Sequence, residues 1–351
     1  MFDFIKFDNS NQVIFQPNLL VSSLFMHTNK WVDFQRALGR NVSQYLILKD
    51  GQQVGYLYIE NNYRKLAKYA YSPFGPVISS EFMTVEFFSE LNEFMKKYIY
   101  DNDLNVFRFD PFKWNLDLTV KLLHAGFKRT LAAVGPKYMW EINLSPSEDE
   151  LLAAMKKVAR YNIKQSEKAG ITIIKASEQS NTDELVKEFY KILEETTKRQ
   201  GFASFDWLYF QKQSEILGLG KDCELFLAKY NGQYVSGAWV NYSEDTVSYT
   251  HGGSVHNPEI QKFGASYLLH WTVIKHSKNM GKKFYNMWGV VPNDELRITN
   301  ASHPLRGVSD FKMRFGGQLI ENIGGFEVTN GGLSNLINRS YDWWVYRNDR
   351  V

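Results

Sequence analysis

Apolar residues along this chain form short alternating or periodic stretches, separated by polar segments rich in turn formers. In the first half, two apolar stretches flank Asp50-Gly51, a pair that favours a tight turn between antiparallel strands. After this β-hairpin the pattern predicts a strand, an amphipathic helix, a strand stopped by Pro111, and a helix ended by Gly126. These elements are expected over residues 45–59, 68–77, 82–98, 106–110 and 116–125, after an earlier helix over residues 19–39.

The same order of elements recurs in the second half of the chain. A hairpin that turns at Asn231-Gly232 is followed by a strand, a helix, a strand and a segment ending in Asp310-Phe311-Lys312. The first four of these elements are expected over residues 224–242, 247–254, 264–280 and 284–290. A repeated unit of strands and helices predicts an α/β protein with two domains, each a mixed sheet flanked by helices.

The boundary between the domains is expected after a strand over residues 138–144. Ser145-Pro146 then opens a new helix. We therefore expect a first domain over residues 1–144 and a second over residues 145–332. A helix rich in Trp and Tyr over residues 333–351 is expected to pack back onto the first domain.

The helix that begins near Ser145 carries a cation at every fourth position of its second part. Steps of four keep side chains on one slowly drifting face of a helix. The four residues are Lys156, Arg160, Lys164 and Lys168, and Glu167 is the one acid among them. Two interpretations stay open: a solvated helix face, or a row of contacts to the phosphates of a nucleic acid.

Composition narrows the class of protein. The 351 residues are 44% apolar and 23% charged, as in globular proteins of two domains, and the formal net charge is only +3. A nucleic-acid contact is therefore expected as a local patch. The single cysteine, Cys223, excludes an internal disulfide, and the seven histidines lack the spacing of metal ligands. We expect no metal, no bound cofactor, no signal peptide and no transmembrane segment, and hence a cytoplasmic protein.

Candidate chemistry concentrates in residues 310–317, DFKMRFGG. Lys312 and Arg314 stand beside two phenylalanines, and two glycines follow them. Cations between apolar walls suit a site that holds an anion or a developing oxyanion. The same residues also suit the C-terminus of a helix, where Lys and Arg are favoured in the last turn and Gly follows it.

A strand, a turn of small residues and a helix, THGGS followed by FGASYLLHW, can present backbone N–H groups to a ligand phosphate. This is the layout of acetyltransferase-like folds. The Arg/Gln-x-x-Gly-x-Gly loop that cradles the pyrophosphate of coenzyme A is missing there. The sequence therefore supports the fold and does not support the use of acyl-CoA.

Several motifs together resemble the FemABX family of peptidoglycan aminoacyltransferases. They are KKVARYNIKQSEKAGI, FYNMWGV and HPLRGVSDFKMRFGG, with GPV and VFRFDP in the first half. The resemblance spans nearly the whole chain, which lacks the long helical-hairpin insertion of some members and is similar to the compact FemX type. It implies two tandem acetyltransferase (GNAT)-like domains. It also implies transfer of an amino acid from aminoacyl-tRNA to an amine of a peptidoglycan precursor.

The resemblance implies roles for individual residues as well. Lys312 is expected to stabilise the transition state, with Phe311 beside it. Arg36 and Tyr209 stand near positions where compact members bind the substrate. We also expect His251 and Arg314 to bind the substrate, and the basic row to bind tRNA.

Two further residues are candidates for handling the proton of the acceptor amine. Asp110 ends a strand beside Pro111 and can orient or deprotonate the amine, with a turn cap as its alternative role. His251 is a second candidate base, with a hydrogen-bonded structural histidine as the alternative.

One departure from the family pattern concerns the acceptor. Phe205 occupies the place of an Arg that holds a nucleotide diphosphate in compact members, and an aromatic ring cannot bind a diphosphate as Arg does. The acceptor stays open between a UDP-linked and a lipid-linked muramyl peptide, and the latter implies peripheral contact with a membrane. Two other functions stay open: an N-acyltransferase that uses acyl-CoA or another acyl donor, and a non-catalytic RNA-binding protein on the same fold.

Overall fold

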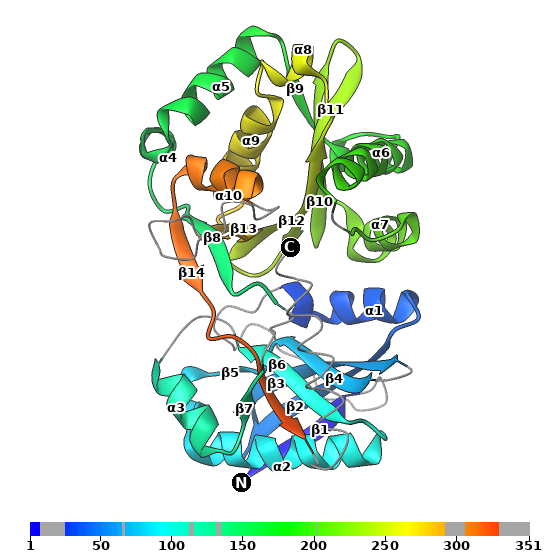
Figure 1. Cartoon of the computed structure of the whole chain (residues 1–351), viewed down its shortest axis with the longest axis vertical. Helices are drawn as coiled ribbons and strands as arrows, with labels where there is room; N and C mark the ends of the chain where they lie inside the picture. Colours follow the sequence, from blue (N-terminus) through cyan, green and yellow to red (C-terminus); the bar gives the residue numbers. More distant parts are fainter. Residues whose placement is uncertain are drawn as a thin grey trace. The chain divides into compact units, whose positions relative to one another are not determined.

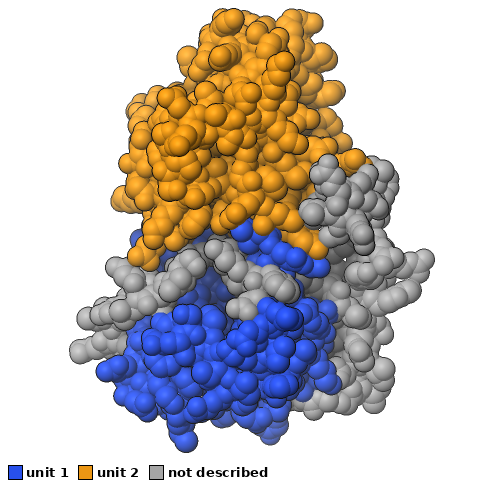
Figure 2. Space-filling view, turned by 90° about the vertical axis from the view of Figure 1, so that its left-hand side faces the viewer, with its two compact units in different colours: residues 1–137, 320–351 blue, residues 138–319 orange. Residues whose placement is uncertain are grey.

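The computed structural model describes residues 1–7, 25–64, 67–111, 116–130, 135–201, 203–291 and 306–329. These residues form two compact units (Figure 1, Figure 2). The first unit comprises Met1–Lys137 and the described residues from Ile320 on, and the second comprises Tyr138–Leu319. Each unit is built on one β-sheet that mixes parallel and antiparallel strands.

The first unit holds an eight-stranded sheet with the order β1-β2-β3-β4-β6-β15-β7, and β5 pairs with β3. The pairs are antiparallel except for β4 and β6, whose parallel pairing needs the crossover that α2 supplies. The strands are β1 Phe2–Phe7, β2 Asn41–Lys49, β3 Gln52–Arg64, β4 Ala67–Phe74, β5 Val77–Ile78, β6 Val106–Pro111, β7 Lys128–Arg129 and β15 Phe326–Thr329. The helices are η2 Phe25–His27, α1 Asn29–Ala37, η3 Ser80–Phe82, α2 Val85–Asp101 and α3 Leu116–His124.

The core of the first unit lies between its sheet and α2. This helix begins where the Thr84 hydroxyl accepts a hydrogen bond from the Phe87 N–H at 3.1 Å. Phe87, Leu91 and Met95 follow each other at steps of four, so they share one face of α2. All three are buried in one cluster with Phe107 of β6.

The second unit holds a seven-stranded sheet with the order β14-β8-β13-β12-β11-β10-β9. Its central strands β12 and β13 run parallel and are joined by α9. The strands are β8 Tyr138–Asn143, β9 Thr172–Lys175, β10 Cys223–Tyr230, β11 Gln233–Tyr242, β12 Thr246–Ser254, β13 Phe284–Gly289 and β14 Gln318–Glu321. The helices are α4 Glu148–Ala154, α5 Lys157–Lys168, η4 Ala176–Glu178, α6 Thr182–Gln200, α7 Trp207–Gln213, η5 Ser214–Gly218, α8 Pro258–Gln261, α9 Ala265–Asn279, α10 Arg306–Lys312 and η7 Met313–Phe315. Figure 1 shows α6 and α7 on one face of this sheet and α5 and α9 on the other.

The predicted repeat and the α/β class are confirmed. Each unit contains a hairpin, a strand, a helix, a strand and a helix, and in each the two single strands pair in parallel. Both hairpins turn on left-handed residues, with φ of 51° and 78° at Asp50-Gly51 and 47° and 82° at Asn231-Gly232.

Two strands belong to the opposite domain from the one expected. Residues 138–143 form β8, which pairs with β13 in the second sheet, and not with a strand of the first domain. Residues 326–329 form β15, which pairs with β6 in the first sheet. The expected boundary after residue 144 and the assignment of residues 320–329 to the second domain are therefore wrong. A strand's apolar pattern predicts that it is buried, but not which sheet it joins.

The single basic helix expected after Ser145 is in fact two helices, α4 and α5. α4 ends at Ala154, and Met155 and Lys156 adopt extended backbone conformations with ψ of 150° and 147° before α5 begins. The break lets the Met155 side chain turn into the core, where it is buried. Of the helix expected over residues 19–39, the structure shows α1; residues 19–24 and the expected helix over residues 333–351 lie outside the described residues.

Candidate active site

The two central strands of the second unit separate at their C-terminal ends. β12 and β13 pair in parallel from Thr246 opposite Phe284 to Ser248 opposite Asn286. Beyond this point each strand has an irregular register with its outer neighbour, β12 with β11 and β13 with β8. Such bulges bend a strand and re-aim its side chains, and they are common beside active sites.

The bulge in β12 turns neighbouring side chains to opposite faces of the sheet. In a regular strand, residues i and i+2 face the same side. Here Thr250 is the extra residue, so Tyr249 meets His270 of α9 with ring centroids 4.6 Å apart, while His251 meets Phe210 of α7 at 5.1 Å. The Thr250 hydroxyl accepts a hydrogen bond from the Asn241 amide at 2.9 Å, which anchors the bulge.

The bulge in β13 makes a backbone carbonyl available. Trp288 has a left-handed φ of 66°, and its N–H donates to the Asn286 side-chain oxygen at 2.7 Å. One residue later, the carbonyl oxygen of Gly289 accepts a hydrogen bond from the Lys312 amine at 2.7 Å. The Ser309 hydroxyl accepts the Val291 N–H at 2.8 Å and so ties α10 to the end of the strand.

Lys312 therefore lies between the end of β13 and the middle of β12. Its amine also lies 5.8 Å from the centroid of the Tyr249 ring, which comes from β12. The side chain is buried, with 7% of the residue exposed. Burial lowers the pKa of Lys312 to about 7, because the charged form loses its hydration. At neutral pH this amine can both give and accept a proton.

Aromatic side chains surround the Lys312 site. Phe311 packs edge-on against Tyr267 at 5.0 Å and Phe315 at 5.2 Å between ring centroids. His270 is buried, and its Nδ1 shares a 2.8 Å hydrogen bond with the Tyr285 hydroxyl. Burial, and secondarily the charge of Lys312, lower the pKa of His270 to about 3. His270 is therefore neutral at physiological pH.

The interpretation of residues 310–317 as a helix C-terminus is confirmed, and the interpretation as an anion site stays a prediction. α10 does end at Lys312, a 3₁₀ turn follows over residues 313–315, and Gly316 has a left-handed φ of 79°. The last helical residue nevertheless points its amine at the strand ends, and not at the carbonyls of its own helix. The Arg314 guanidinium donates a hydrogen bond to the Tyr267 hydroxyl and so borders the same aromatic group.

His251, expected as a base or a structural histidine, lies on the other face of the sheet in a second aromatic cluster. Phe205 stacks on Tyr209 with centroids 3.8 Å apart and planes 7° apart, and both rings meet the His251 ring at 5.6 Å. Burial lowers the pKa of His251 to about 4, so the ring is neutral. Phe205 is 41% exposed, which leaves an aromatic side chain at the surface of this cluster.

Asp110 and Arg36 belong to the first unit, whereas Lys312 belongs to the second. Asp110 is buried at the end of β6, and its Oδ2 accepts hydrogen bonds from the Tyr71 hydroxyl and the Gly135 N–H, both at 2.7 Å. Both partners are distant in the chain, so these contacts are not those of a local turn cap, and a role of Asp110 in proton transfer stays a prediction. Arg36 lies on the surface of α1, with a 3.4 Å ion pair to Asp33.

The basic row does not form one continuous face. The Arg160 guanidinium donates to the backbone carbonyls of Ala153 and Met155, so it caps the C-terminus of α4. Lys156 precedes the helix. Arg160 therefore has a structural role at the end of α4, and its expected contact with a phosphate stays a prediction.

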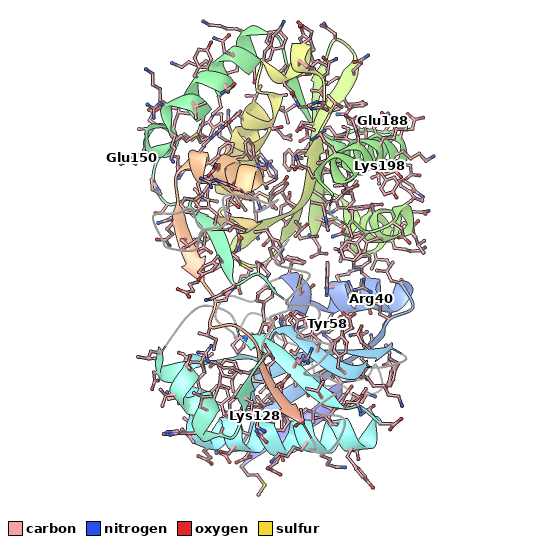
Figure 3. All side chains as sticks on the ribbon, in the orientation of Figure 1. Arg40, Tyr58, Lys128, Glu150, Glu188 and Lys198 are labelled. Atoms are coloured by element: carbon pink, nitrogen blue, oxygen red, sulfur yellow. The ribbon has the colours of Figure 1, made fainter. Side chains whose placement is uncertain are left out.

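The exposed face of α5 is nevertheless unusual in its charge. It carries Lys157, Tyr161, Lys164 and Lys168, all exposed, after the equally exposed Lys156. Several lysines on other helices have ion pairs within the helix, among them Lys96–Glu93, Lys97–Asp101, Lys191–Glu188 and Lys198–Glu194. Figure 3 shows Glu188 and Lys198 on α6. Within the described part of the chain, the α5 lysines form no ion pair, so their charge is not neutralised locally.

Sequence reasoning missed several residues that build the site. Tyr249 and His270 lie in stretches that predict an ordinary strand and an ordinary helix, and Gly289 contributes only its backbone. The signals available were the unusual density of small and aromatic residues in VSYTHGGS and FYNMWGV. Neither bulge has a sequence signature that fixes its position.

Comparison with known proteins decides the family. Residues 116–233 and 221–334 match the model of the FemAB family, and these ranges together cover more than half of the chain. The chain belongs to the FemAB family. The resemblance inferred from its motifs is confirmed.

Individual FemAB relatives and related structures are more distant. Over 283 residues the chain is 23% identical to a lipid II:glycine glycyltransferase of Staphylococcus haemolyticus (strain JCSC1435), a match covering 62% of this chain and 65% of that relative. The crystal structure of FemX has a TM-score of 0.75 at 19% identity, covering 92% of this chain and 96% of FemX. A tandem GNAT protein from the clavulanic acid biosynthesis pathway has a TM-score of 0.52 at 9% identity, covering 95% and 99% of the two chains. The tandem GNAT-like fold is therefore confirmed.

Proposed function

We propose that this chain is an aminoacyltransferase that moves an amino acid from aminoacyl-tRNA to an amine of a peptidoglycan precursor. The observation that carries the proposal is the buried Lys312 amine, which lies between the Gly289 carbonyl and the Tyr249 ring. The neighbouring Phe311 and Phe315 rings pack against each other beside it. Membership of the FemAB family supports it, as does similarity to a relative named for transfer of glycine to lipid II.

The proposed reaction needs charge stabilisation and proton transfer. A carbon–nitrogen bond forms between the acceptor amine and the aminoacyl carbonyl carbon, and the ester bond to the tRNA ribose breaks. The Lys312 ammonium stabilises the oxyanion and passes its proton to the leaving ribose oxygen. The resulting neutral amine takes up the proton that the acceptor nitrogen loses. An amine whose pKa is about 7 suits both steps.

The proposed tRNA surface is the exposed face of α5. Lys157, Lys164 and Lys168 are exposed on it and form no ion pair within the described residues, and Lys156 precedes them. Unneutralised lysines release counterions from a nucleic-acid backbone on binding. Tyr161, which is 60% exposed among them, offers a ring on which an unpaired base can stack.

For the acceptor we propose a lipid-linked precursor. The cluster of Phe205, Tyr209 and His251 is aromatic and neutral, which suits an apolar or uncharged group better than a nucleotide diphosphate. A donor charged in the cytoplasm places the reaction on the cytoplasmic side of the membrane. No helix in the described part of the chain is both long and apolar enough to span that membrane.

The test is single-turnover transfer of label from a pool of aminoacyl-tRNAs to lipid-linked and UDP-linked muramyl pentapeptides in parallel. Lys312→Met is expected to lower the rate about 10²–10³-fold, as loss of an oxyanion donor does. Lys282→Met is the matched control, because Lys282 also donates to backbone carbonyls, those of Ser243 and Glu244, in the turn before β12. This control is expected to keep the wild-type rate.

Each outcome of the transfer assay has a defined meaning. Label on the lipid-linked acceptor that depends on Lys312 supports the proposal. Label on the UDP-linked acceptor alone contradicts the proposed acceptor. No label from tRNA, with transfer from acyl-CoA to the same amine, contradicts the proposed donor.

A further inference from the structure

A row of apolar side chains runs along the outer face of α3. Leu116, Val120 and Leu123 are 62%, 42% and 46% exposed, and their spacing of four and three residues puts them on one face. Leu118 and Leu122, on the other side of the helix, are buried in the core of the first unit. α3 is thus apolar on two faces, and the first unit covers only one of them.

This row is distinct within the described residues. No other helix there exposes three large apolar side chains on one face. Single exposed apolar residues are normal on protein surfaces, but contiguous ones mark contact with a partner or a membrane. In Figure 1, α3 lies at the outer edge of the first unit.

Beside the row, the charge that is not neutralised within α3 is positive. The one acid of α3, Asp117, forms a 2.6 Å ion pair with Lys121. The helix ends at His124, and the exposed Lys128 follows in β7 (Figure 3). An apolar helix face beside cations fits the boundary between the headgroups and acyl chains of an anionic bilayer.

We propose that the α3 row, defined as Leu116, Val120 and Leu123, docks the chain on an anionic lipid surface. A helix of nine residues is about 13 Å long, and three side chains fall far short of the roughly 800 Å² that each partner buries in a stable protein interface. Docking explains how a lipid-linked acceptor is reached, and this explanation, unlike the docking itself, rests on the proposed function.

The direct test is co-sedimentation of the whole chain with vesicles of phosphatidylcholine and phosphatidylglycerol. The variant Leu116→Ser/Val120→Ser/Leu123→Ser is expected to lower the binding constant about tenfold or more, because binding strength follows the apolar area inserted. Tyr100→Ser is the control, since Tyr100 is 81% exposed on α2, outside the row. It is expected to bind like the wild type. Equal vesicle binding by the triple variant and the wild type overturns the proposal.

A second measurement separates docking from folding and from catalysis. The triple variant is expected to unfold at the wild-type temperature and to transfer normally to acceptor in detergent micelles, but more slowly to acceptor in vesicles. If the wild type transfers to no acceptor while vesicle binding still depends on the row, the proposed function fails and docking stands. The wild type could instead sediment as a dimer and the triple variant as a monomer, with equal vesicle binding by both. In that case the row is a contact between copies of the chain, and the docking proposal fails.

Discussion

The amine of Lys312 donates a hydrogen bond to the backbone carbonyl oxygen of Gly289 at 2.7 Å. Lys312 ends α10 and Gly289 ends β13, so this bond fixes the helix end to the end of a central strand. A carbonyl accepts a hydrogen bond from an ammonium and, more weakly, from a neutral amine. Lys312 can therefore change its charge without losing its position.

The burial of Lys312 predicts a pH dependence of stability. The ordinary lysine pKa of 10.5 applies in the unfolded chain, whereas the folded value is about 7. Between these values the unfolded state binds more protons, so the free energy of unfolding rises with pH, by up to about 1.4 kcal/mol per pH unit. Urea unfolding between pH 7 and 9 is expected to show this slope in the wild type and a shallower one in Lys312→Met. Identical slopes in the wild type and in Lys312→Met contradict a buried lysine with a lowered pKa.

Buried neutral histidines predict loss of stability in acid. Burial lowers the pKa of His27 and His251 to about 4 and that of His270 to about 3, from 6.5. Below pH 6.5 the unfolded state takes up protons that the folded state does not, so stability falls as pH falls toward 4. His251→Phe keeps the aromatic cluster and removes one of these groups. Its free energy of unfolding is expected to fall less between pH 6.5 and 4.5 than that of the wild type, as measured by urea titration.

The α5 face predicts a salt-dependent affinity for RNA. Reversing charge at Lys157, Lys164 and Lys168 is expected to weaken tRNA binding and to flatten its dependence on log salt by roughly 0.7–0.9 per lost phosphate contact. The control reverses Lys191 and Lys198 of α6, which are already paired with glutamates. Fluorescence anisotropy over a salt series measures the tRNA affinity and its salt dependence for both variants. An unchanged slope in the α5 variant means that this face is a solvated helix surface and makes no phosphate contacts.

Two glycines near the site are expected to respond in opposite directions to the same substitution. At Gly317 an added Cβ would lie 2.4 Å from the Glu141 carbonyl oxygen, and φ is +96°, so Gly317→Ala is expected to cost more than about 2 kcal/mol. At Gly307, within α10, an added Cβ meets nothing within 4 Å. Gly307→Ala is expected to stabilise by about 0.4–1 kcal/mol, because it restricts the unfolded chain. Thermal unfolding of the two variants compares them directly, and a stabilised Gly317→Ala contradicts the close approach.

The repeated fold was predictable because its signals are local. The turns at Asp50-Gly51 and Asn231-Gly232, together with the apolar periods around them, specify hairpins and helices over a few residues. The assignment of β8 and β15 to their sheets was not predictable in this way. The apolar pattern of each strand would suit either sheet. Only the pairing of β8 with β13 and of β15 with β6 decides which sheet each strand joins.

The sequence by itself determined the two α/β units and the family, and it singled out Phe311 and Lys312 as candidate site residues, because these depend on local periodicity and on a contiguous motif. The tertiary structure alone decided what surrounds Lys312. The bulge at Thr250 turns Tyr249 toward α9, the irregular end of β13 offers the Gly289 carbonyl, and burial sets the charge of the amine. A pKa and a bulge are set by neighbours distant in the chain, and a one-residue shift in a strand reverses every side chain beyond it.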